Sequence, residues 1–327
     1  MRRLIVTVTG LVMALGLIAA AAAASTLPSV TVGVAPSPDM SLLIIAVKKG
    51  FLKNQGLDAK LELFESSPSA LQGVVAGRAD ITANTEPPQL AARARGGKIV
   101  QVMTGYMSGR QNGLVVDSKV ITKPADFTGK AIGVQRGSGG NYHMVWFLER
   151  NKIPQEKVEP KYMAAPDQIA ALARGDIAAF FSWEPFLSKA ASDVPGAKIF
   201  SRSIEDGLSF AGNVVMREDL AKNNKPVAIR IVKGLIAASD WISANVDEAA
   251  KVANEVLRAP SDELVATQIR NLQWPGTFKK SVVEQEIRIA EWGAGIKLFP
   301  TSDPKKLVQD FVYPALIKEA APGRTDL

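Results

Sequence analysis

The chain has 327 residues, of which 47% are hydrophobic and 22% are charged, which is typical of a soluble globular protein long enough for two lobes. It contains no cysteine, which excludes disulfides, thiolate metal sites, iron–sulfur clusters and cysteine nucleophiles. The formal net charge is +7, but basic and acidic residues are interspersed, so nothing indicates a nucleic-acid partner.

The N-terminal segment has the pattern of a secretory signal. Arg2 and Arg3 precede an uncharged run over residues 4–24 that is rich in Leu, Val and Ala and ends in an alanine cluster. An uncleaved membrane anchor is the alternative, because the run is almost long enough to span a bilayer. The alanine cluster favours cleavage. We therefore predict a signal peptide over residues 1–24 and a mature chain in the periplasm.

The first elements after this segment follow a β, α, β order. Residues 30–34 alternate and predict a strand, which the prolines of Pro36–Asp39 end. Ser41 can cap a helix over residues 42–49, and residues 59–64 predict the next strand. Short connections between such elements are typical of a parallel sheet flanked by helices.

Two later segments are similar to each other. Residues 71–81, followed by Glu86-Pro87, and residues 169–177, followed by Glu184-Pro185, each predict a helix, a turn containing Asp, a short strand and a loop that opens another helix. A unit used twice predicts two similar lobes. Chance similarity between alanine-rich helices is the alternative.

Two apolar runs without helical period, residues 113–117 and 212–217, predict paired crossover strands or a hinge. We therefore predict a first lobe over residues 28–116 and 213–327, with a second lobe over residues 117–212 inserted into it. From Pro226 onward the spacing of apolar residues is helical, which predicts a tail of helices packed against the first lobe.

A glycine-rich turn separates a predicted strand at residues 130–134 from a long apolar helix. Gly137, Gly139 and Gly140 allow close approach of a ligand to the backbone, and Ser138 or Asn141 can cap the helix. The unpaired N–H groups of a helix start favour a phosphate, sulfonate, carboxylate or nitrate. The turn matches neither a P-loop nor a dinucleotide fingerprint, and the alternative is a plain strand-to-helix connector.

Four parts of the chain, taken in sequence order, resemble the nitrate, sulfonate and taurine group of periplasmic substrate-binding proteins that serve ABC importers. They are Lys49–Leu52 with Gly56–Asp58; Ala76–Ile81 with Glu86–Pro88; Gly129–Val134 with Gly137-Ser138; and Pro166–Leu172 with Gly175-Asp176 and Trp183–Pro185. The resemblance implies an α/β periplasmic binding protein of type II. Two lobes joined by two crossovers would close over a small ligand, which shifts the population toward the closed form. It further implies a monomer that works with an ABC permease in the inner membrane and uses no cofactor and no metal.

Sites in open α/β sheets lie outside the carboxyl ends of the strands, so the loops there supply the candidate ligand-binding residues. The candidates are Ser37, Asp39, Ser41, Asn84, Thr85, Glu86, Arg110, Gly137, Ser138, Trp183, Glu184 and Phe210. Trp183 can stack on a carbon skeleton or belong to a core. Glu86 and Glu184 can cap the helices that open at their prolines or bind an amine. Arg110 can pair with an anion or face solvent.

The first loop departs from the family pattern. It reads Pro36–Met40, with Asp39 inside, instead of the Lys- and Gly-rich form associated with sulfonate binders. A carboxylate there opposes a highly charged anion. The charges therefore predict a small organic anion of the sulfonate, sulfate ester or carboxylate type, or a zwitterion whose amine meets Asp39 or Glu86.

Two other roles remain as alternatives to import. A periplasmic partner that senses a ligand for a membrane kinase would use the same cleft. An enzyme on the same scaffold is disfavoured, because related enzymes use a cysteine or a histidine cluster and this chain has only His143, which we expect in a core.

Overall fold

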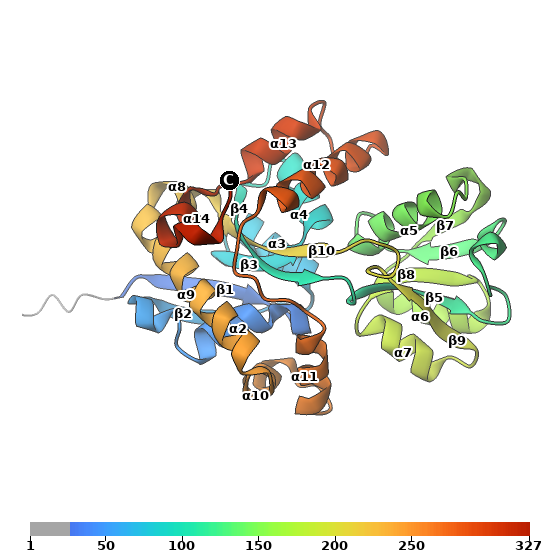
Figure 1. The fold of residues 1–327 in the computed structure, drawn as a ribbon, viewed down its shortest axis with the longest axis horizontal. Coiled ribbons are helices and arrows are strands. Elements are labelled where there is room, and N and C mark those ends of the chain that lie inside the picture. Colours follow the sequence, from blue (N-terminus) through green and yellow to red (C-terminus); the bar gives the residue numbers. More distant parts are fainter. Residues whose placement is uncertain (1–26) are drawn as a thin grey trace, which may run out of the picture.

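The computed structural model describes residues 27–327, which form two α/β lobes (Figure 1). The predicted signal peptide, residues 1–24, lies outside the described residues. Within residues 27–327, no helix combines the length and the apolar character that a membrane crossing needs.

The first lobe is built on a five-stranded mixed sheet. Its strands, in spatial order, are β2 (Asp58–Leu63), β1 (Ser29–Val34), β3 (Ile81–Thr85), β10 (Phe210–Arg217) and β4 (Ile99–Ser108). β1 pairs in parallel with β2 and β3, whereas β10 runs antiparallel to β3 and β4. Three helices follow its strands: α2 (Ser41–Lys48), α3 (Ser67–Val75) and α4 (Glu86–Ala94). Short turns join them, as the β, α, β order predicts.

The second lobe repeats this plan. Its strands, in spatial order, are β7 (Glu159–Tyr162), β6 (Ala131–Val134), β8 (Ala179–Trp183), β5 (Asn112–Asp117) and β9 (Ala197–Arg202). The helices are α5 (Gly139–Arg150), α6 (Ala165–Arg174) and α7 (Phe186–Asp193). The strands of the two similar sequence segments, β3 and β8, occupy the same place in their sheets, each beside an antiparallel strand. The sequence repeat thus corresponds to a structural repeat.

The predicted crossover strands are in fact central strands. Residues 113–117 belong to β5, between β8 and β9, and residues 212–217 belong to β10, between β3 and β4. Their apolar runs carry no alternation because both faces of each sheet are covered. The chain changes sheet at residues 109–111 and 203–209, a few residues from the predicted lobe boundaries. These segments touch each other, since the N–H of Ile204 donates to the C=O of Gly109 at 2.8 Å.

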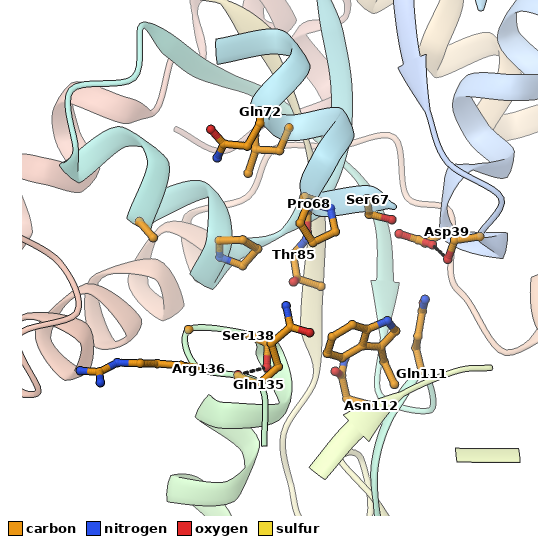
Figure 2. Close-up of a pocket in the computed structure, with 18 of the residues that line it drawn as sticks. Asp39, Ser67, Pro68, Gln72, Thr85, Gln111, Asn112, Gln135, Arg136 and Ser138 are labelled. Atoms are coloured by element: carbon orange, nitrogen blue, oxygen red, sulfur yellow. Dashed lines mark hydrogen bonds between the residues drawn. The ribbon is translucent and has the colours of Figure 1, made fainter. Parts of the chain in front are cut away.

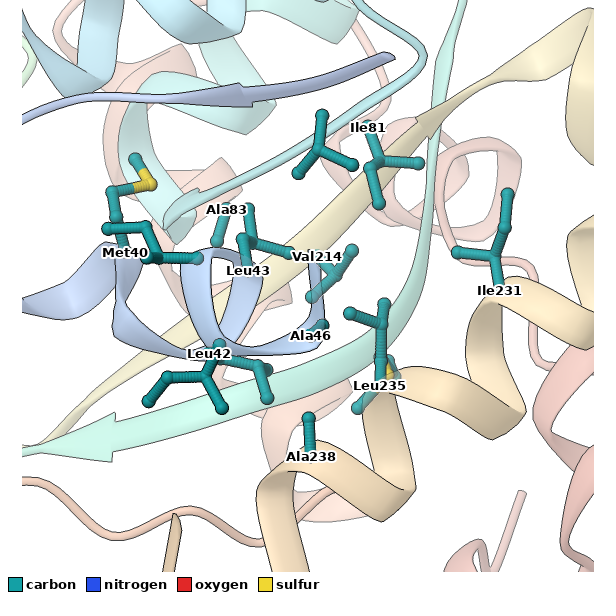
Figure 3. Close-up of a cluster of buried hydrophobic side chains, with 14 of the residues drawn as sticks. Met40, Leu42, Leu43, Ala46, Ile81, Ala83, Val214, Ile231, Leu235 and Ala238 are labelled. Carbon is teal, nitrogen blue, oxygen red and sulfur yellow. The ribbon is translucent and has the colours of Figure 1, made fainter. Parts of the chain in front are cut away.

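After β10 the chain is helical. The helices are α8 (Glu218–Asn223), α9 (Lys225–Ala244), α10 (Val246–Leu257), α11 (Asp262–Arg270), α12 (Lys280–Gly295), α13 (Pro304–Phe311) and α14 (Ala315–Ala320). The predicted apolar face of α9, which includes Ile231, Leu235 and Ala238, is fully buried beside α2 (Figure 3). Burial of such a face provides most of the stability of a helix in a protein.

The helical tail packs against the first lobe, and it also reaches the second lobe. The Trp292 ring at the end of α12 packs edge-to-face on Tyr142 of α5, with ring centroids 5.1 Å apart. Leu298, just beyond α12, lies against Gly137. One apolar cluster therefore joins the C-terminal helices to the helix that begins at the glycine turn.

Candidate functional site

A cleft of about 220 Å³ lies where strands of both sheets end (Figure 2). Seven of the predicted ligand-binding residues line it: Ser37, Asp39, Asn84, Thr85, Gly137, Ser138 and Trp183. They come from the loops after β1 and β6 and from the ends of β3 and β8. The structure therefore brings candidates from both lobes to one cavity, as expected for carboxyl ends of parallel strands.

Three other candidates do not line this cleft. Ser41 is buried at the start of α2, and its hydroxyl has no hydrogen-bond partner among residues 27–327. Phe210 is fully buried, with its ring 6.3 Å from that of Tyr142. Arg110 is exposed beside a smaller hollow, which agrees with the solvent-facing alternative.

Glu184 lies just outside the cleft and caps the start of α7. Its carboxylate accepts hydrogen bonds from the N–H of Ser188 at 3.1 Å and from the hydroxyl of the same residue at 2.8 Å. It also pairs with Arg202 at 2.6 Å, and both side chains are largely shielded from water. A carboxylate in this position satisfies first-turn amides, so the geometry matches the capping alternative.

The glycine turn places the start of α5 at the cleft. The Ser138 hydroxyl accepts the N–H of Asn141 at 3.2 Å and donates to the C=O of Gln135 at 2.7 Å, so it caps the helix. Gly139 lines the cleft, and its first-turn N–H has no acceptor within the helix. A Cβ on Gly140 would lie 2.7 Å from the carbonyl oxygen of Phe181, so glycine allows α5 to pack on β8.

The first turns of the other helices at the cleft offer fewer donors. α4 begins with Glu86 followed by two prolines, Pro87 and Pro88, which carry no N–H. α3 has Pro68 in its first turn, and the Ser66 hydroxyl takes the N–H of Ser69 at 3.3 Å. The start of α5 is therefore the part of the cleft best suited to an anion.

The first-lobe side of the cleft contains a buried carboxyl group. Asp39 is only 4% exposed, and it accepts hydrogen bonds from the hydroxyls of Ser37 and, at 3.3 Å, of Tyr106. Burial raises the pKa of the Asp39 carboxyl above its usual value, although these hydrogen bonds act in the opposite direction. Nearby, the Asn84 side-chain N–H₂ is buried without an acceptor among the described residues.

Sequence reasoning missed several lining residues. Ser67 and Gln72 lie on α3, Gln135 and Arg136 follow β6 directly, and Gln111 lies in a crossover segment. Ligand sites lie in the loops that follow strands, and this applies equally to the loop after β2 and to the residues after β6. Most of the missed lining residues could therefore have been predicted from the sequence. Gln111 carries no such signal, because the sequence pattern places the crossover later in the chain.

Basic residues reach the cleft only at its rim. Arg95 and Arg136 line it and are exposed, and the Arg136 guanidinium lies over the Tyr162 ring at 5.3 Å from the centroid. Exposed cations of this kind raise the local concentration of anions more than they fix one in place. Within residues 27–327, no group of three or more acidic or imidazole side chains is arranged to hold a metal ion.

Comparison with known proteins assigns the chain to a family. The model of the NMT1-like family matches residues 23–257. The chain belongs to the NMT1-like family. This finding and the relatives described next confirm the predicted resemblance to the sulfonate and taurine group of binding proteins.

Two relatives of this NMT1-like chain are binding proteins by name. A Bacillus subtilis (strain 168) protein described as a candidate aliphatic sulfonates-binding protein is 23% identical over 286 residues, which cover 81% of this chain and 85% of the relative. The taurine-binding periplasmic protein of Escherichia coli (strain K12) is 28% identical over 200 residues, which cover 60% of this chain and 61% of the relative.

A solved structure shows the same fold. The alkanesulfonate-binding protein of Xanthomonas axonopodis pv. citri, bound to MOPS, superposes with a TM-score of 0.72 at 20% identity, covering 89% of this chain and 100% of that chain. The predicted α/β fold of a two-lobed periplasmic binding protein with a helical C-terminal region is thus confirmed.

Glu86, the remaining candidate, lies beneath the cleft and does not line it. It is fully buried, and one carboxylate oxygen accepts the N–H of Ala211 at 2.8 Å and the side-chain amide of Gln285 at 2.7 Å. Burial raises the pKa of Glu86 from its usual 4.5 to about 7. Burial and the nearby Glu86 charge also raise the pKa of Glu286, which accepts a hydrogen bond from Asn213 at 2.8 Å.

The raised pKa of Glu86 predicts a pH-dependent stability. The folded state binds a proton more tightly than the unfolded state, so stability is lost as pH rises from about 4.5 through about 7, by about 3 kcal/mol. The Glu86→Gln variant keeps the acceptor oxygen and carries no charge, so it should lose less stability over this range. Urea unfolding at pH 5 and pH 8 measures the difference. The control is Glu184→Gln, which should follow the wild type, and an equal loss in Glu86→Gln would contradict the assignment.

Proposed function

We propose that this chain is the periplasmic solute-binding component of an ABC importer and captures a small organic anion, or a zwitterion, between its lobes. The observation that carries the proposal is the open start of α5 in a cleft lined by both lobes. A sulfonate, sulfate ester or carboxylate suits these N–H donors. The names of the two relatives and of the structural neighbour support this ligand class.

Capture proceeds by hinge closure. A ligand that contacts Ser138 on one side and Asn84 or Thr85 on the other binds the closed form more tightly than the open form, so it shifts the population toward closure. The two crossover segments, residues 109–111 and 203–209, are the covalent links that a rotation of the lobes must bend. The closed form is then what an inner-membrane permease recognises.

In the proposed function, the chain binds its ligand and does not convert it. His143, the only histidine of the sequence, is fully buried and lies 2.7 Å from the carboxylate of Asp206, away from the residues that line the cleft. A general base must reach the proton that it removes, and the imidazole does not. Polar cleft residues such as Asn84 and Ser138 instead suit binding.

A ligand screen tests binding and turnover together. The mature chain should gain thermal stability in the presence of one class among sulfonates, sulfate esters, carboxylates and nitrate, because a ligand that binds only the folded state stabilises it by mass action. A ligand at about 100 times its Kd adds about 2.7 kcal/mol. Melting curves and chromatography of the recovered ligand provide the two readouts, and formation of a product would favour an enzyme instead.

A charge at the start of α5 should abolish anion binding. In the Ser138→Asp variant the new side chain can still cap the helix, but it places a negative charge beside the Gly139 N–H. We expect the Kd for an anionic ligand to rise about 100-fold or more, measured by titration calorimetry. The Ser138→Asn variant is the matched control, since it caps the helix without a charge and should stay within about tenfold of wild type. Unchanged affinity in Ser138→Asp would remove this helix start from the site.

A further inference from the structure

The two sides of the cleft are chemically opposite. On the second-lobe side the start of α5 presents the capped turn of Ser138 and the free N–H of Gly139, which favour negative charge. On the first-lobe side lies Asp39, the only acidic residue among the described residues that line the cleft. Figure 2 shows Asp39 and Ser138 on opposite sides of the cavity. An anion bound at α5 therefore does not explain the acid on the other side.

Asp39 lacks a positively charged partner. Its oxygens accept hydrogen bonds from the hydroxyls of Ser37 and Tyr106, and a hydrogen bond from the Gln111 side chain also lowers its pKa. All of these donors are neutral, and none of the ion pairs within residues 27–327 includes Asp39. The two arginines at the cleft, Arg95 and Arg136, are exposed at the rim. A carboxylate on a residue that is only 4% exposed is costly to ionise without a cation, and the raised pKa of Asp39 reflects this cost.

Two side-chain amides on the first-lobe side of the cleft also contain polar atoms without hydrogen-bond partners. Gln111 lies next to Asp39 in the cleft (Figure 2), and its side-chain oxygen is buried without a donor among the described residues. The Asn84 side chain is only 6% exposed, lines the cleft, and has an N–H₂ without an acceptor there. The Asp39 carboxylate and the Gln111 oxygen are acceptors and suit the N–H groups of an ammonium, whereas the Asn84 N–H₂ is a donor and suits an oxygen of the ligand.

We propose that Asp39 determines specificity by selecting ligands that carry a positively charged N–H group in addition to their anionic group. The anion binds at the start of α5, and the ammonium group binds the Asp39 carboxylate and the Gln111 side-chain oxygen. The ligand cation then provides the countercharge that the protein itself does not supply. This inference rests on the proposed function and narrows its ligand class from organic anions or zwitterions to zwitterions alone.

A purely structural role for Asp39 predicts a different outcome. Asp39 lies in the single turn η1 (Pro38–Met40) before α2, where an acid stabilises a helix start. If this were its whole role, removal of the charge would weaken every ligand equally, because only the shape of the loop would change. Two ligands that differ in one amine separate the two roles.

The test measures two pairs of probes on three proteins by titration calorimetry, in a buffer free of sulfonates and amines. The pairs are taurine with ethanesulfonate and β-alanine with propionate, which differ within each pair only in the amine. The wild type should bind at least one amino compound about 10- to 100-fold more tightly than its partner, as a buried charge pair implies. In Asp39→Asn, which keeps the shape and one acceptor oxygen, that preference should fall below about threefold. The Ser138→Asp variant should weaken both members of the preferred pair together.

Each remaining result overturns a defined part of the argument. Equal binding of both members of a pair by the wild type overturns the role of Asp39 and leaves anion capture standing. An equal loss of both members in Asp39→Asn, with an unchanged melting temperature, also overturns it. Failure of every probe, including ethanesulfonate and propionate, overturns anion capture itself together with this inference.

Discussion

The two-lobed structure depends on one antiparallel strand in each sheet. Each of these strands enters its sheet directly after the chain has crossed between the lobes. β10 returns from the second lobe to lie between β3 and β4, and β5 enters the second sheet between β8 and β9. The second sheet forms from residues between the two crossings, whereas the first sheet is complete only after the second crossing has brought β10 back. The carboxyl ends of β1, β3, β6 and β8 face a common space, because β1 runs parallel to β3 and β6 runs parallel to β8, while the inserted strands β10 and β5 run antiparallel to them.

The chemistry of that space follows from what begins each helix. Glycines after Ser138 leave backbone donors free at α5, whereas Pro87 and Pro88 remove them at α4. Asp39 supplies the opposite charge on the first-lobe side. Beneath the surface, Glu86 uses its carboxylate to bind β10 and α12 rather than a ligand. The cleft thus favours negative charge on one side and positive charge on the other. Local sequence determines the charge preference of each side, and the fold determines the distance between the two sides.

The sequence predicts the features of the fold that depend on residues close together in the chain. The β, α, β order, the repeated unit and the glycine turn all appear in the structure, because they follow from periodicity and turn chemistry. Long-range partners were not predictable. Glu86 and Glu184 occupy matching places in the repeat, yet Glu86 turns inward to Ala211, 125 residues away, while Glu184 caps its own helix. The crossover positions were also shifted, since an apolar run does not tell a central strand from a linking strand.

The contact between the end of the chain and the glycine turn has a mechanical consequence. Leu298 packs against Gly137, and Trp292 packs against Tyr142, so the C-terminal helices of the first lobe touch the second lobe. The same apolar cluster includes Leu208 of the second crossing segment. A rotation of the lobes must therefore open or slide this apolar contact as well as bend the backbone links, so side chains and backbone together limit the path of opening.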